Sequence, residues 1–138
     1  MNTFRDNKGR QWTCRVDYAA LRRVRDTLGI NLADTAVNDK GENVILTRIA
    51  SDPVLLVDVL FLVCCFRDGA STVTDDDFAE SIVGDVIDDA SLALLTGIAE
   101  FFPTSRRLPM LKAVEMTRAA MKEYRESMTA TLTGESPE

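Results

Sequence analysis

The strongest pattern in the chain is the apolar segment 53–66, PVLLVDVLFLVCCF, in which twelve of fourteen residues are apolar and Asp58 is the only charge. Asp52 and Pro53 before it favour a helix start, since aspartate caps a first turn and proline suits the first helical position. A helix that is apolar on nearly every side is either buried in a core or covered by a partner. It is too short to cross a bilayer, which takes about 20 apolar residues.

Apolar residues at helical spacing predict the other helices. Asp17 and Gly29 are suited to cap a helix over residues 18–28, with a stripe made of Tyr18, Leu21, Val24 and Leu28. Thr74 is suited to cap a helix that begins with Asp75, Asp76 and Asp77, whose charges favour the positive end of the helix dipole. We also expect a helical turn within 31–36 and helices over about 42–50 (with Val44, Ile45 and Ile49 inward), 89–102, and from Ser105 or Leu108 to Met128.

Alternating apolar and polar residues near the start predict a β-hairpin. Residues 3–5 and 10–16 are strand-like, and the connector Asp6-Asn7-Lys8-Gly9 has turn chemistry. An isolated hairpin is marginal in water, so this one must pack on helices or pair with the edge of another chain. We therefore predict a mainly α fold: a small helical domain of about five to six helices over residues 1–128, with an N-terminal hairpin (about 3–16) and a flexible polar tail over 129–138.

The amino-acid composition limits the kinds of catalysis and metal binding that are open to this chain. The 138 residues are 46% hydrophobic and 28% charged, which suits one globular domain. There is no histidine, which excludes histidine-based acid–base catalysis and Ser-His-Asp or Cys-His nucleophiles. The cysteines Cys14, Cys64 and Cys65 form no CxxC pair, and residues 1–15 contain no apolar signal region. We expect reduced thiols, a cytoplasmic location, no cofactor, no metal and no catalytic residue, so not an enzyme.

Charge is unevenly distributed. Residues 1–25 carry seven Arg or Lys against two Asp, residues 68–105 carry nine Asp or Glu and no basic residue, and residues 106–126 are basic again. These regions are either solvated faces that attract one another within the fold, or complementary patches that orient a partner or neighbouring copies. The net charge of −6 argues against general nucleic-acid binding. A small regulator that contacts nucleic acid remains an alternative through Arg22, Arg23, Arg25, Arg106 and Arg107.

Several short segments over most of the chain are distinctive together: Phe4-x-Asp6-x-x-Gly9-Arg10-x-Trp12, Asp17-Tyr18 with Leu21 to Arg25, Ser51 to Leu60, Asp77-Phe78, and Phe101-Phe102-Pro103. In these segments the chain resembles a family of small phage and prophage proteins of tail assembly. The resemblance implies a tail assembly chaperone, which holds the long hydrophobic tape-measure protein soluble while the tail tube polymerises. It also implies that no catalytic residues are needed.

Such a chaperone must offer an apolar groove to an amphipathic helix and remain soluble itself. The apolar helix and the methionine-bearing C-terminal helix are the candidate groove walls, and methionine side chains adapt to varied partners. The predicted partner-binding residues are Leu55, Leu56, Val59, Leu60, Val63, Met110, Leu111 and Met121. The expected partner is a tape-measure or other phage tail protein, and a homo-oligomer is left open. A structural virion subunit, acting through protein–protein contacts, is the main alternative.

Overall fold

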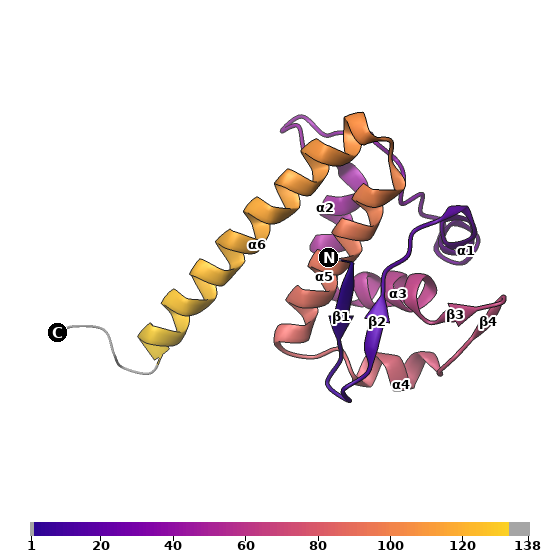
Figure 1. Cartoon of the computed structure of the whole chain (residues 1–138), viewed down its shortest axis with the longest axis horizontal. Coiled ribbons are helices and arrows are strands. Elements are labelled where there is room, and N and C mark those ends of the chain that lie inside the picture. Colours follow the sequence, from indigo (N-terminus) through magenta and orange to yellow (C-terminus); the bar gives the residue numbers. More distant parts are fainter. Residues whose placement is uncertain (1, 133–138) are drawn as a thin grey trace.

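The computed structural model describes residues 2–132. Within them the mainly α fold with an N-terminal hairpin is confirmed. In chain order the elements in Figure 1 are β1 (Thr3–Arg5), β2 (Gln11–Thr13), α1 (Tyr18–Leu28), α2 (Val44–Ala50), α3 (Pro53–Cys64), β3 (Phe66–Arg67), β4 (Ala70–Ser71), α4 (Asp75–Glu80), α5 (Asp85–Phe101) and α6 (Thr104–Leu132).

The predicted helix starts are confirmed where a side chain caps the first turn. Asp17, Asp52 and Thr74 each accept a hydrogen bond from the backbone N–H three residues later. At the other end of α1, Gly29 adopts the left-handed conformation (φ 71°), and its N–H donates to the carbonyl of Arg25. Glycine takes this conformation at little cost, which is why α1 ends where the sequence indicates.

Other boundaries differ from the sequence prediction. Residues 31–36 form only a turn, and α2 begins at Val44 because Asn43 caps it. The helix predicted over 89–102 begins earlier, at Asp85, since Gly84 (φ 65°) ends the preceding turn. The apolar helix ends at Cys64, and the chain then forms the short β3–β4 hairpin instead of a loop. Helix α6 continues past the expected end at Met128 to Leu132, and residues 133–138 of the predicted tail lie outside the described residues.

The core is built around α3, which packs against α1, α2, α4 and α5. Side chains from each of these helices are buried there, including Val24, Ile49, Val59, Leu60, Phe78, Leu94 and Ile98. Two predicted inward residues are exceptions, since Tyr18 is 74% exposed and Val44 is 43% exposed. Each is the first residue of its helix, and helical side chains lean toward the N-terminus, so both extend beyond the packed face.

The N-terminal hairpin packs directly on α5 (Figure 1). Strands β1 and β2 pair antiparallel, with Phe4 opposite Trp12. Just after β2 the backbone comes so close to α5 that a Cβ atom at Gly97 would lie 2.2 Å from the carbonyl oxygen of Cys14. Only glycine permits this approach. The hairpin therefore forms a layer on the helical body. This packing is needed because a hairpin on its own is only marginally stable.

Candidate protein-binding surface

The structure corrects the role predicted for α3. Leu56, Val59, Leu60 and Val63, predicted to bind a partner, are at most 6% exposed and belong to the core. The physical reason is that α3 has no polar face except at Asp58, so the surrounding helices cover most of it, although Val54 in its first turn stays 71% exposed. Asp58 itself lies in solvent, and Leu55 is half-buried. Val59, Leu60 and Val63 are therefore not available as the wall of an open groove, and Leu56, which is 5% exposed, lines only a hollow of about 40 Å³.

The remaining candidates lie on α6, where they belong to a regular apolar stripe. The stripe alternates steps of four and three residues and consists of Met110, Val114, Thr117, Met121, Tyr124 and Met128, of which only Thr117 is polar; we call it the α6 stripe. This is the spacing of the seam of a coiled coil, which lines up on one face of a helix. Leu111, the third predicted residue on α6, is half-buried and lies beside the stripe.

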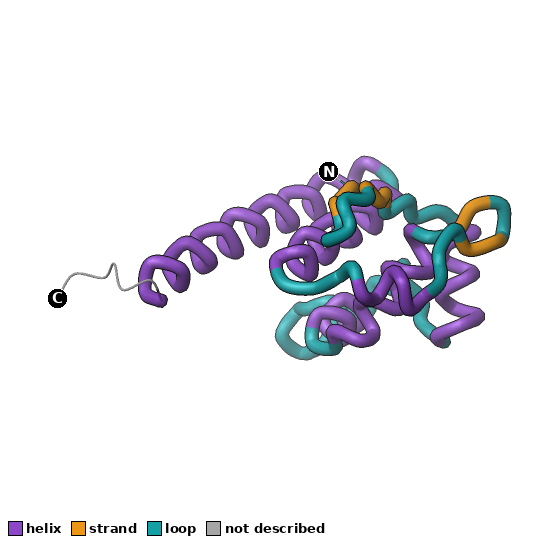
Figure 2. Tube along the Cα trace, turned by 90° about the horizontal axis from the view of Figure 1, so that it is seen from below, coloured by secondary structure: helices purple, strands orange, loops and turns teal. Residues whose placement is uncertain are grey.

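Burial along the α6 stripe decreases toward the C-terminus. Val114 is 6% exposed, whereas Tyr124 is 60% and Met128 is 42% exposed. Helix α6 packs on α5 near the connection between the two helices and then projects past the other elements (Figure 1, Figure 2). Its far part is held by exposed ion pairs from Arg125 to Asp85 (3.6 Å) and Asp88 (3.2 Å). The C-terminal half of the stripe is therefore an apolar helix face with little cover from its own chain.

A furrow adjoins the covered half of the α6 stripe. Its cavity is about 160 Å³ and lies between α2, α5 and α6, lined by Leu46, Leu95, Met110, Ala113, Val114 and Thr117. A smaller hollow of about 40 Å³ shares Leu46 and Leu95 and extends the furrow along α2 and α5. The sequence did not indicate that Leu46 lines the furrow. The stripe on α6 could have been predicted in full from its alternating spacing of four and three residues. Furrow and stripe together form one apolar surface.

A polar cluster joins the hairpin turn to α4. The carboxylate of Asp6 accepts hydrogen bonds from Trp12 Nε1 (2.8 Å) and Arg10 Nε (2.8 Å). Arg10 also pairs with Asp77 (2.6 Å), as does Lys8. Burial by itself raises the pKa of Asp6, but the hydrogen bonds from Trp12, Arg10 and Lys8 outweigh it and lower that pKa to about 2. Asp6 is thus a charged, fully engaged structural group, not a free acid or base.

The arginines proposed to contact nucleic acid are partly engaged with their own chain. The guanidinium of Arg23 lies 4.5 Å from the centroid of the Phe66 ring and donates to the carbonyl of Leu62. Arg107 donates to the carbonyl of Phe102 (3.2 Å). Two of the five predicted contacts are therefore used to hold helices and connections in place.

The three cysteines are free thiols, and the Sγ atoms of Cys14 and Cys64 lie 3.4 Å apart. The neighbouring Cys14 and burial hold the pKa of Cys64 well above its usual range, and burial raises the pKa of Cys65. Neutral thiols are poor nucleophiles and poor metal ligands. Within residues 2–132, no group of three or more His, Cys, Asp or Glu side chains is arranged to hold a metal ion.

Comparison with protein-family models, curated proteins and solved structures gives no match. In the part of the chain that the structure describes, no helix is both long and apolar enough to cross a membrane. What the furrow and the α6 stripe can bind must therefore be inferred from their shape and chemistry.

Proposed function

We propose that this protein is a tail assembly chaperone of a phage or prophage, which binds an amphipathic helix of the tape-measure protein. The observation that carries the proposal is the α6 stripe, whose apolar face continues beyond the body of the protein with little cover from its own chain. An amphipathic helix laid into an apolar groove is a common mode of peptide recognition. The resemblance of the sequence to tail assembly proteins is the reason for proposing the tape-measure protein as the partner.

The chemistry of the surface suits a partner with many similar apolar segments. Met110, Met121 and Met128 supply unbranched side chains that repack around different partners. No partner-specific charged residue lines the furrow, so recognition depends on apolar shape. The net charge of −6 keeps the chaperone itself soluble while it presents this surface.

The free energy of binding requires that a partner contact both the furrow and the projecting half of the α6 stripe. Full burial of one large apolar side chain contributes about 1.5–3 kcal/mol. Association costs at least about 4 kcal/mol in lost translational and rotational freedom. Met121, Tyr124 and Met128 are only partly exposed, so covering them alone barely exceeds that cost. A partner helix must therefore contact the furrow as well as the projecting half of the stripe.

The test is co-expression with the tape-measure protein of the same locus, followed by co-purification and mass determination of the complex. We expect a soluble complex, with the tape-measure protein insoluble when expressed alone. The double variant Tyr124→Asp with Met128→Asp should fold but fail to keep the partner soluble. The matched control is Leu108→Asp with Met116→Asp, which adds the same charge at exposed apolar positions of α6 that lie off the stripe.

Three outcomes would overturn the proposal: a tape-measure protein that is soluble alone and ignores this protein, undiminished binding by the stripe variant, or equal loss in the control. In the first case a structural subunit becomes the better hypothesis. Retention of the protein in purified phage particles would then support it.

A further inference from the structure

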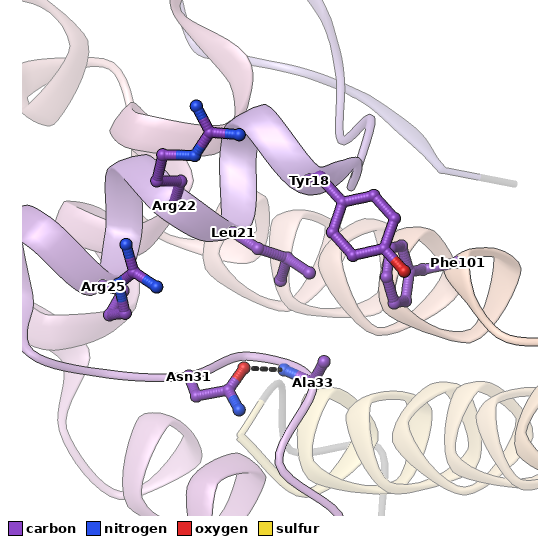
Figure 3. Close-up of a pocket in the computed structure, with 7 residues that line it drawn as sticks. All are labelled: Tyr18, Leu21, Arg22, Arg25, Asn31, Ala33 and Phe101. Carbon is purple, nitrogen blue, oxygen red and sulfur yellow. Dashed lines mark hydrogen bonds between the residues drawn. The ribbon is translucent and has the colours of Figure 1, made fainter.

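A second pocket lies on a different part of the surface, between α1, the turn after it and the end of α5. Its volume is about 420 Å³, within the range of ligand-binding pockets. Figure 3 shows that Tyr18 and Phe101 lie at one end and that Arg22 and Arg25 extend from α1 at the other. Leu21 lies between the two ends. The pocket therefore combines an apolar half with a cationic half.

The apolar half presents an aromatic side chain that the fold does not bury. Tyr18 is 74% exposed, and its ring meets Phe101 edge to face with centroids 5.2 Å apart. Contact on one side only holds the tyrosine in place and leaves its other side open. Tyrosine and arginine are enriched among residues that dominate binding energy at protein interfaces. This composition is typical of an interaction site.

The cationic half has positive charge that the chain leaves largely uncompensated. Within residues 2–132, the guanidinium of Arg22 makes no hydrogen bond and no ion pair. Arg25 pairs only with its neighbour Asp26, at 3.1 Å and in solvent. Of the described residues that line the pocket, none is acidic. Because Arg22 and Arg25 are three residues apart on α1, both charges lie on one side of that helix.

We propose that this pocket binds an acidic peptide segment of a partner protein. An apolar side chain of the peptide packs on Tyr18, Leu21 and Phe101, and flanking carboxylates pair with Arg22 and Arg25. Guanidinium groups suit carboxylates because their donors match the two oxygens. A peptide fits both halves of the pocket, since one short segment can carry an apolar side chain beside its carboxylates. The site is separate from the furrow and does not depend on the proposed function.

The test is fluorescence anisotropy with a fluorescein-labelled peptide of sequence DDLFDD. The comparison ligands are KKLFKK and a single-stranded oligonucleotide with the same net charge as DDLFDD. We expect the acidic peptide to bind the full chain, and higher salt to weaken binding. Arg22→Gln with Arg25→Gln should weaken binding about tenfold. Tyr18→Ala should weaken it about fivefold or more. All three side chains are exposed, so thermal unfolding should stay unchanged in the arginine variant and fall only slightly in Tyr18→Ala, which loses the ring contact with Phe101.

The matched control is Lys112→Gln with Lys122→Gln, which removes the same charge from exposed positions of α6 and should leave peptide binding intact. The stripe variant Tyr124→Asp with Met128→Asp should also bind the peptide normally, which separates this site from the chaperone surface. The proposal is overturned if DDLFDD does not bind, if KKLFKK binds equally well, or if the arginine variant binds as the parent does. Tighter binding of the oligonucleotide, lost in the arginine variant, would assign the pocket to phosphates instead.

Discussion

Helices α3 and α6 differ in how apolar they are and in how much of that apolar surface remains in contact with solvent. Helix α3 is apolar on nearly every side, and five of its residues are at most 6% exposed: Leu56, Val59, Leu60, Leu62 and Val63. Helix α6 is polar on average but carries a narrow apolar stripe, whose last members are about half exposed. The less hydrophobic helix thus offers the better binding surface.

The difference follows from how much apolar surface each helix must have covered by its neighbours. A helix without a polar face has no stable position except inside, so the fold places other helices around it. A helix with one apolar stripe needs cover along that stripe only, and α5 is shorter than α6, so the cover ends before the stripe does. Total hydrophobicity therefore predicts burial, whereas a stripe longer than its covering helix predicts a binding surface.

The largest effect is expected from a charge in α3. Leu60 is fully buried, and Leu60→Asp places an unpaired carboxylate in the core at a cost of several kcal/mol. We expect loss of helicity by circular dichroism and loss of soluble protein. A variant that unfolds cooperatively near the parental temperature would show that α3 does not form the core.

The next largest effect on the free energy of unfolding is expected from Gly97→Ala, at the contact between the hairpin and α5. Helix propensity alone predicts that Gly97→Ala stabilises α5 by about 1 kcal/mol. The approach of the Cys14 carbonyl predicts the opposite sign, a loss of about 1–3 kcal/mol, because the hairpin must shift to admit the new methyl group. Urea unfolding of parent and variant decides between the two signs. A stabilised variant would mean that the hairpin is not held against α5.

Acid should weaken the hairpin itself, through Asp6, and its attachment to α4, through Asp77. The pKa of Asp6 is about 2 in the folded protein and near 3.8 otherwise, so its contribution is present above pH 4 and is lost as the pH falls toward 2. This corresponds to about 2 kcal/mol. The pKa of Asp77, lowered by Lys8 and Arg10, gives a change of the same sign. Urea unfolding from pH 6 to pH 2 measures the loss, and Asp6→Asn should show less of it in that window.

The smallest effect completes the comparison of the two helices. Met128→Asp makes the same kind of change as Leu60→Asp, but on the projecting end of α6. Because Met128 is 42% exposed, we expect the free energy of unfolding to change by about 0.5 kcal/mol or less. Thermal unfolding followed by circular dichroism measures it. A loss as large as that of Leu60→Asp would show that the end of α6 packs on its own chain.

Local chemistry explains what the sequence could predict. The bounds of α1 follow from Asp17 and Gly29, which act within a few residues, and the start of α3 follows from Asp52 and Pro53. The mainly α fold and the hairpin were predictable for the same reason. In α5 the prediction began four residues too late because Gly84, not an aspartate, ends the preceding turn.

Long-range packing explains the rest. An apolar pattern on all sides of α3 fits a core and an interface equally well, so only its neighbours in space decide that Leu60 is buried. The stripe from Met110 to Met128 can be recognised in the sequence, but its exposure depends on how far α5 extends alongside α6. Likewise Tyr18 and Arg22 come from one helix and Phe101 from another, so no local pattern indicates the pocket they share.

The hairpin that rests on Gly97 also constrains the order of events during synthesis. Its turn is tied to the body by a hydrogen bond from Asn7 to the carbonyl of Ser81, which lies 74 residues later in the chain. At typical rates of translation that interval is roughly 4–15 s, whereas a hairpin forms within about 10 μs. The hairpin, which is made first, must therefore wait for Ser81 and then for α5 before it can pack, and the fold is completed only when most of the chain has been synthesised.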